Sequence, residues 1–339
     1  MKINKYMEYK CENGRLSEMN YLKGFSILTI VLMHLLAFVD VPKKIITLSA
    51  VGGAGVHVFF VCSGMGLYFS YLNKKIKFIE FIKKRWTKIY IPYIIVVFIS
   101  FLCHWMYLGN DRLSAFISHI FLYKMFIPKY EESFGIQFWF ISTIIQFYLL
   151  FIPMCKLKEK IDNNKLFLPM GLLISVFWWI ICYVLNVSDI RVWNSFCLQY
   201  IWEFSFGMVL ADEFKKGKIY KIYILQLFFV AVVGLGLQAG LAMYLDKFKL
   251  FNDIPALFGY SALSLLLMNI KLIKKVCVII SKFSYELFLI HILVFKTVFQ
   301  IIQFNSLTMQ IIEALIAFIL SLICAFIYNR LINNSLFKY

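Results

Sequence analysis

The sequence predicts an all-α integral membrane protein with about ten transmembrane helices. Three observations lead to this fold class. Of the 339 residues, 62% are hydrophobic, the mean hydropathy is +0.79, and the hydrophobic residues gather in runs long enough to cross a bilayer. Only 16% of the residues are charged, too few to cover the surface of a soluble domain of this size. We therefore expect a single polytopic unit over residues 1–339, with no appended soluble domain.

Ten hydrophobic runs have the length of transmembrane helices. Their approximate bounds are Tyr21–Val39, Ala50–Leu72, Ile89–Leu108, Phe134–Cys155, Leu166–Leu185, Ser195–Ala211, Ile219–Leu245, Phe251–Ile270, Ile280–Ile302 and Thr308–Leu331. Loops on one side hold about three times as many lysines and arginines as loops on the other, so the positive-inside rule predicts that both termini are cytoplasmic. The first run follows a charged stretch directly, which predicts a retained anchor rather than a cleaved signal.

The distribution of the cations and cysteines argues against a nucleic-acid-binding protein and against a protein held together by disulfides or a metal site. The formal net charge of +17 comes mainly from lysines in short loops between the runs, which indicates membrane topology and not nucleic-acid binding. The eight cysteines are scattered singly, and most of them lie within hydrophobic runs. Without a CxxC pair or a histidine-rich cluster, the sequence predicts small core residues, and neither disulfides nor a metal site.

The first run carries two ionisable side chains on one helix face. Lys23 and His34 are eleven residues apart, which places them about 16 Å apart along one side of a helix. Ionisable groups inside a membrane cost free energy and usually face a cavity or a reaction path. An interfacial lysine that extends to the lipid headgroups explains Lys23 equally well. His34 lies too deep for that explanation and is the first candidate for a functional residue.

The second run opens with the glycine-rich segment Gly52–Gly55 and carries His57 and Ser63. His57 is expected near the outer face, and Ser63 about 9 Å deeper along the helix. Small residues let helix backbones approach closely. From spacing alone, a packing helix with an interfacial histidine explains this segment about as well as a functional site does.

A cationic segment follows the second run on the predicted cytoplasmic side. It includes Lys84, Arg85 and Lys88, and the three-residue spacing predicts that Arg85 and Lys88 share a helix face. A guanidinium beside an ammonium suits the binding of phosphate groups. Charge alone favours a simpler explanation, a topology signal that contacts anionic lipid headgroups.

Five sequence blocks, in this order, resemble the acyltransferase family 3 membrane proteins. They are a cation, a glycine and then a histidine eleven residues after the cation, followed by GAGVHVFFVCSG, RWTKIYIP, FWFIS with YLLFIP, and FSYELFLIH. Together they cover the chain nearly end to end. Lys23 stands where the family most often has arginine, and Lys88 replaces the second arginine of the family's RxxR pattern.

The resemblance implies transfer of an acyl group, often acetyl, from cytoplasmic acyl-CoA to hydroxyl groups of an extracytoplasmic glycan. In this interpretation His34 is the general base or orients the acceptor hydroxyl, because imidazole titrates in the useful range. Lys23 holds the carbonyl side or a phosphate of the donor, and Arg85, Lys88 and Lys84 bind acyl-CoA phosphates. No permanently bound cofactor is expected, and acetyl-CoA is the first candidate for the donor.

Other polar residues receive secondary roles. Ser63 and Tyr285 are candidate donors to the developing oxyanion, with Tyr285 also counted among the acyl-CoA contacts, although a plain interhelical hydrogen bond explains each of them equally well. The resemblance adds His291 to the catalytic candidates. His57 and Trp139 are candidates for contact with the acceptor.

Glu203 lies in the middle of a predicted span and needs a cation or a proton there. Lys296 and His291 are its candidate partners.

Two other functions stay open at this stage. A transporter or flippase for a glycan precursor would also need buried charges, but it predicts paired broken helices, and no such repeat is evident. A non-catalytic membrane subunit of a polysaccharide synthase is the third reading. The expected setting is the plasma membrane of a bacterium, with lipid, acyl-CoA and a glycan or polysaccharide as partners; a homo-oligomer or further biosynthetic partners are not decided by the sequence.

Overall fold

The computed structural model describes residues 6–9, 17–244, 250–304 and 306–336. In chain order, its elements are β1 Tyr6–Tyr9, α1 Ser17–Leu36, α2 Lys43–Ser49, η1 Ala50–Ala54, α3 Gly55–Asn73, α4 Phe78–Arg85, η2 Trp86–Tyr90, α5 Ile91–Leu102, η3 His104–Met106, α6 Arg112–Ile120, η4 Lys124–Phe126, η5 Pro128–Tyr130, η6 Ile136–Phe138, α7 Trp139–Ile161, α8 Asn164–Val184, α9 Arg191–Asn194, η7 Cys197–Tyr200, α10 Ile201–Lys215, β2 Tyr220–Tyr223, α11 Ile224–Tyr244, α12 Asp253–Leu267, α13 Lys271–Ile280, η9 Ser281–Phe283, α14 Ser284–Ile301 and α15 Leu307–Leu336.

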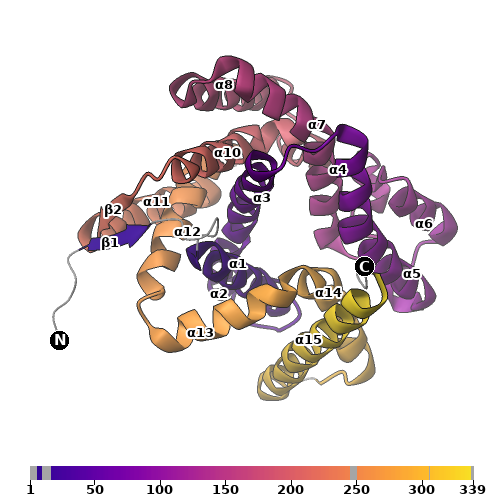
Figure 1. Cartoon of the computed structure of the whole chain (residues 1–339). Coiled ribbons are helices and arrows are strands. Elements are labelled where there is room, and N and C mark those ends of the chain that lie inside the picture. Colours follow the sequence, from indigo (N-terminus) through magenta and orange to yellow (C-terminus); the bar gives the residue numbers. More distant parts are fainter. Residues whose placement is uncertain (1–5, 10–16, 245–249, 305, 337–339) are drawn as a thin grey trace.

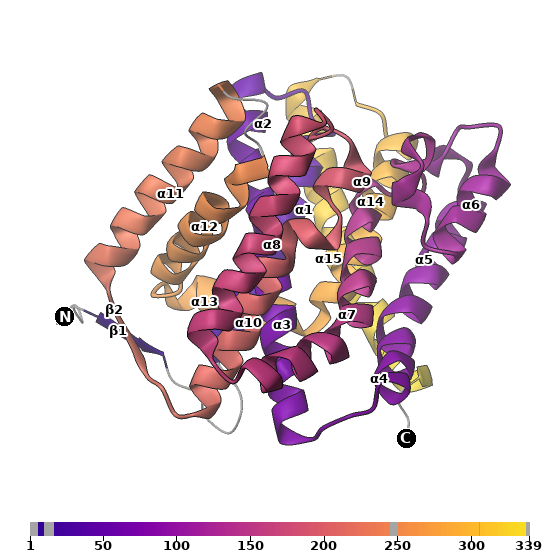
Figure 2. The ribbon, with the colours of Figure 1, turned by 90° about the horizontal axis from the view of Figure 1, so that it is seen from above.

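The molecule is a bundle of long apolar helices, seen in two perpendicular views in Figures 1 and 2. Helix α3 packs against α10, α11 against α12, and α14 against α15. Helix α1 contacts α3, α13 and α14, so it links the α3–α10 pair to the α14–α15 pair. Many large apolar side chains on the outer helices are exposed, for example Leu173 in α8 and Leu225 in α11, which are 68% and 65% exposed. A lipid-facing surface explains this exposure.

Nine helical segments within the described residues are long and apolar enough to cross a membrane, so the chain is an all-α multi-pass membrane protein. The predicted span Ser195–Ala211 is not one of these nine, because its residues form a short 3₁₀ turn, η7, followed by α10, which has only 15 residues.

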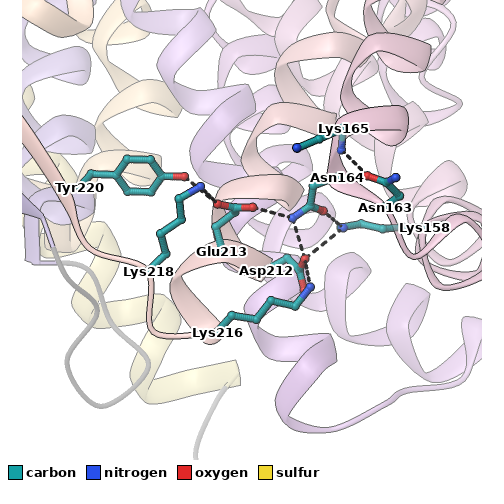
Figure 3. Close-up of polar contacts among 9 residues, drawn as sticks. All are labelled: Lys158, Asn163, Asn164, Lys165, Asp212, Glu213, Lys216, Lys218 and Tyr220. Atoms are coloured by element: carbon teal, nitrogen blue, oxygen red, sulfur yellow. Dashed lines mark hydrogen bonds and ion pairs between the residues drawn. The ribbon is translucent and has the colours of Figure 1, made fainter.

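Helix α10 still carries the chain back across the bundle. Asn164, at the start of α8, donates hydrogen bonds of 2.8 and 3.0 Å to Asp212 and Glu213, near the end of α10 (Figure 3). The start of α8 therefore lies beside the end of α10, and the two helices run in opposite directions.

The polar cluster in Figure 3 fastens the ends of three helices. The buried Lys158 of α7 lies 3.5 Å from the carboxylate of Asp212 and also donates to Asn164. Asn163 caps α8 by accepting a hydrogen bond from the backbone N–H of Lys165 at 2.9 Å. These contacts hold the α7–α8 turn against the end of α10.

Contacts near the ends of α3, α10 and α15 show which parts of the chain lie together at one face of the bundle. Lys215 of α10 donates to Asn73 of α3 at 2.5 Å, which brings the ends of these two helices together. Near the end of α15, Tyr328 donates to the carbonyl of Pro92 at the start of α5. Strand β1 pairs with β2, which directly follows α10, so β1 lies on this face too.

Several local features differ from the expectation of uninterrupted spans. The antiparallel pair β1–β2 was not predicted, and β2 occupies the start of the predicted span Ile219–Leu245, so α11 begins only at Ile224. Leu245 lies outside the described residues. The glycine-rich opening of the second span forms the 3₁₀ turn η1, and α3 begins at Gly55.

Two short helices, α2 and α13, also precede transmembrane segments without having been predicted. Residues Arg112–Ile120, between the predicted spans Ile89–Leu108 and Phe134–Cys155, form α6. Cys11 lies outside the described residues, and the other seven cysteines are free thiols.

Candidate active site

Two histidines from opposite ends of the sequence meet inside the bundle. His34 of α1 and His291 of α14 lie with their rings nearly parallel, and His34 Nδ1 is 2.9 Å from His291 Nε2. His291 is fully buried, whereas His34 is half-buried. The structure thus joins the two histidines that the sequence had placed among its catalytic candidates.

A backbone carbonyl fixes the hydrogen positions of this pair. His291 Nδ1 lies 2.9 Å from the carbonyl oxygen of Leu287, which only accepts, so Nδ1 carries the hydrogen and His291 Nε2 of the neutral ring is an acceptor. His34 Nδ1 must then donate to His291 Nε2. This arrangement leaves the lone pair of His34 Nε2 unprotonated, which is the form that accepts a proton.

A cavity of about 210 Å³ begins one helical turn below the pair, where Ile30 precedes His34 in α1. Its wall brings together Lys23, Ser63 and Tyr285, from α1, α3 and α14. Tyr285 donates to the carbonyl of Ile89 at 2.6 Å, so its ring is held in place. Three predicted site residues that are far apart in sequence therefore share one chamber.

Arg85 lies near the ends of α3 and α4, on the side of the Lys23 chamber away from the histidine pair. It lines a cavity of about 220 Å³ together with Lys74 and Lys84, near the ends of α3 and α4. It also lines a narrow cavity of about 40 Å³, whose other wall residues include Ile89 and Tyr148. Ile89 and Tyr148 also line the chamber of Lys23. The narrow cavity therefore lies between Arg85 and that chamber.

Lys84 and Lys88, the other two predicted phosphate-binding cations, are more exposed than Arg85. Lys84 forms an exposed ion pair of 2.9 Å with Glu80, one turn earlier in α4. Lys88 is exposed and lies in η2, a π-helical turn between α4 and α5, outside the lining of the cavities that Arg85 borders. A π-turn has more residues per turn than an α-helix, so it rotates Lys88 relative to Arg85. Such turns are frequent at functional sites.

A larger cavity, about 490 Å³, opens at the other end of α14. Lys296 contributes to its wall with Trp105, Tyr107 and Glu132. Trp105 donates from its indole nitrogen to Thr297 at 3.1 Å, which fixes the ring against α14. Lys296 is five residues beyond His291 on the same helix, so this cavity lies on the far side of the histidine pair from Arg85.

His57 and Trp139, the two residues predicted for acceptor contact, both lie beside the ring of Tyr200. Tyr200 has its ring centroid 5.8 Å from that of His57 and 6.2 Å from that of Trp139. The guanidinium of Arg191 lies 5.4 Å from the centre of the Trp139 ring. His57 and Trp139 therefore belong to one aromatic group, and His57 lies on a different face of α3 from Ser63.

Glu203 pairs with His57, and the expectation that Lys296 or His291 would be its partner is wrong. His57 Nδ1 lies 2.7 Å from Glu203 Oε1, and His57 Nε2 lies 3.9 Å from Asp253 Oδ1. Asp253 was not among the predicted site residues, because it stands in the first turn of a helix with no motif around it. The one hint in the sequence near Glu203 is Gln199, a second polar residue one helical turn earlier in the same predicted span.

A family model described as an acyltransferase domain, that of acyltransferase family 3, matches residues 16–330. The chain belongs to acyltransferase family 3. Searches of curated proteins and of solved structures found no match. Because the matched segment runs from the start of α1 through most of α15, the family assignment applies to the whole bundle, and the protein is a membrane acyltransferase.

Two glycines of the family 3 motif blocks lie where helix backbones approach closely. A Cβ at Gly24, beside Lys23, would lie 1.8 Å from the carbonyl oxygen of Cys277 in α13. A Cβ at Gly64, beside Ser63, would lie 2.2 Å from the carbonyl oxygen of Phe204. In each case only glycine lets the backbones come this close. The glycines of the acyltransferase family 3 blocks thus set the positions of the neighbouring polar side chains.

Proposed function

We propose that the protein is an O-acyltransferase that moves an acyl group, with acetyl the first candidate, from cytoplasmic acyl-CoA to a hydroxyl group of an extracytoplasmic glycan or exported polysaccharide. The observation that carries this proposal is the order of the groups along the bundle. The Arg85 cavity comes first, then the chamber of Lys23, then the histidine pair, and last the cavity of Lys296. A donor and an acceptor can thus approach the same histidines from opposite faces.

The donor end suits an acyl-CoA. Lys74, Lys84 and Arg85 line the cavity at this face, and cations with N–H donors bind phosphate groups. The narrow cavity beside Arg85 leads to the chamber where Lys23 lies, which is the path proposed for the pantetheine arm and its thioester. Lys23 then polarises the thioester carbonyl or pairs with a phosphate.

The proposed reaction is a direct acyl transfer. His34 Nε2 takes the proton of the acceptor hydroxyl, the resulting oxygen attacks the thioester carbonyl carbon, and an oxyanion develops on the carbonyl oxygen. Lys23, with Ser63, stabilises that oxyanion, whereas the hydroxyl hydrogen of Tyr285 is already donated to the carbonyl of Ile89. The C–S bond then breaks, an ester remains on the acceptor, and the CoA thiolate receives the proton from His34.

The acceptor end suits a sugar. A saccharide has an apolar face and a rim of hydroxyl groups, so aromatic rings beside charged side chains form a fitting wall. Trp105 and Tyr107 supply the rings, and Lys296 and Glu132 supply the charges. In the plasma membrane of a bacterium, acyl-CoA is available inside and envelope glycans outside, so both substrates reach one bilayer.

The test compares the envelope polysaccharides of cells with and without the gene by mass spectrometry. We expect ester-linked acyl groups to disappear without the gene and to return on complementation with the wild type. Complementation with His34→Gln should fail, because glutamine accepts no proton at neutral pH; loss of a general base slows a reaction about 10²–10⁴-fold.

His104→Gln is the matched control, because His104 is an exposed histidine outside the chamber. It should restore acylation in full. Identical acyl content with and without the gene would refute the proposed acceptor class. Normal acylation by His34→Gln, with His34→Ala as a second variant, would remove the base role from His34.

A further inference from the structure

His57, Glu203 and Asp253 form a buried cluster that the acyl-transfer mechanism does not use. The three side chains come from α3, α10 and α12, and each can offer one ligand atom such that all three atoms lie within 4.8 Å of one another. From the geometry of this cluster, we propose that these residues bind a divalent transition-metal ion of the zinc class. The ligands would be one imidazole nitrogen and one oxygen from each carboxylate.

Two buried oxygen atoms in and beside the cluster lack hydrogen-bond partners among the described residues, which indicates a bound ligand. Glu203 is fully buried, and its Oε2 has no hydrogen-bond partner among the described residues. Gln199 is 1% exposed; its amide nitrogen donates to Asp253 Oδ2 at 2.7 Å, while its Oε1 is likewise unpartnered within the described part of the chain. An unsatisfied buried oxygen costs free energy, and a cation that accepts its lone pair removes that cost.

The charges of the cluster balance with a divalent ion. A metal-bound imidazole is neutral, so two carboxylates and one divalent cation form a neutral group, which is much less costly to bury than an unpaired charge. Glu203 and Asp253 both lie in the first turn of their helices, where the helix dipole favours the ionised carboxylates that a metal requires.

The distances suit a zinc-like ion after small rotations. Ligands at about 2.0–2.2 Å from zinc lie at most about 4.4 Å apart. His57 Nε2 and Asp253 Oδ1 are already 3.9 Å apart. His57 Nδ1 and Glu203 Oε1 are 2.7 Å apart, also within the distance that two ligands of one zinc ion can have. Mixed nitrogen and carboxylate donors favour zinc over calcium or magnesium, which prefer oxygen alone.

The experiment measures metal bound to the purified full-length protein. The wild type and the variants Glu203→Gln and Asp253→Asn are stripped with EDTA, incubated with ZnCl₂, desalted and analysed by elemental mass spectrometry. Glu313→Gln is the matched control, because Glu313 is a buried carboxylate of α15 that also has an unpartnered oxygen among the described residues. We expect about one zinc per chain in the wild type and the control, and at least tenfold weaker binding in the two variants.

A melting experiment keeps the proposal falsifiable even where a variant folds poorly. EDTA should lower the Tm of the wild type, and ZnCl₂ should restore it, because a ligand that binds only the folded state stabilises it. A wild type that binds no zinc, and whose Tm is unaffected by EDTA and ZnCl₂, would overturn the site. Equal zinc content in the wild type, Glu203→Gln and Asp253→Asn would also overturn it.

Discussion

The histidine pair shows how one backbone atom determines which imidazole nitrogen accepts a proton. The Leu287 carbonyl requires the hydrogen of His291 on Nδ1, so His291 accepts from His34, and the lone pair at His34 Nε2 is left free. In the proposed mechanism His291 is a positioning residue that acts through His34. It differs from a buried packing histidine because its removal changes which tautomer His34 adopts.

We predict that His291→Leu lowers kcat about tenfold or more, while the affinity for acyl-CoA stays the same. Leucine removes the acceptor for His34 Nδ1–H, and one lost buried hydrogen bond corresponds to about 1–3 kcal/mol. His291→Gln retains an amide oxygen that can accept this hydrogen, so it should recover part of the rate. Single-turnover kinetics with isothermal titration of acyl-CoA separate the two effects. Equal rates in both variants would contradict the positioning role.

A second prediction concerns Arg85, the cation that borders two cavities. Arg85→Ala should weaken acyl-CoA binding about tenfold, since a hydrogen bond to a charged group contributes about 1.5–3 kcal/mol. Lys83→Ala removes the same charge from an exposed position of α4 and should have little effect. Isothermal titration of detergent-purified protein provides the measurement. Equal losses in the two variants would mean that the segment acts by charge alone.

At the scale of elements, the interface of α3 with α10 determines where the functional side chains lie. A Cβ at Gly207 would meet the carbonyl of Val61 at 2.1 Å, and a Cβ at Gly64 would meet that of Phe204 at 2.2 Å, so the two helices approach through reciprocal glycines. This close contact brings Glu203 beside His57 on one side of α3. On another side, Ser63 lines the chamber of Lys23.

Gly64→Ala should therefore destabilise the protein by about 1–3 kcal/mol, the usual cost of overpacking. Gly66→Ala is the control in the same helix, because a Cβ there meets no atom within 4 Å. Alanine at that position should be neutral or slightly stabilising, since glycine weakens a helix. Thermal melts followed by size-exclusion chromatography report the difference. The same Tm for both variants would show that α10 can shift without cost.

At the scale of the whole molecule, direction across the membrane decides which substrate meets which cavity. The proposed path requires the Arg85 cavity to face the cytoplasm and the Lys296 cavity to face outward. The lysine-rich loops support this orientation. The structure places the ends of α3 and α10 on one face, which agrees with the same assignment.

Topology reporters test this orientation directly. Fusions after Lys84 and after Lys216 should read cytoplasmic, and a fusion after Lys129 should read external, because Lys129 borders the outer cavity. Alkaline phosphatase and a cytoplasmic fluorescent protein give opposite signals at each position. An external signal after Lys84 would separate the Arg85 cavity from cytoplasmic acyl-CoA and refute the donor path.

The sequence by itself determined the class of the fold and supplied candidate site residues. Long apolar runs determine membrane helices because lipid cannot satisfy backbone polar groups, and only helices of that length satisfy their own. A polar residue in such a run stands out, so Lys23, His34 and Ser63 were visible as candidates. The limits of this signal appear in α10, where hydropathy predicted a span but the helix has only 15 residues.

Only the tertiary structure decided which polar groups meet. His34 and His291 are 257 residues apart, and His57 and Glu203 are 146 apart, so no local pattern relates them. Their pairing depends on which helices pack and on the faces they present, set by contacts such as that of Gly64 with Phe204. Helix formation is a local property with a periodic signal in the chain, whereas helix packing depends on the shapes of two distant surfaces.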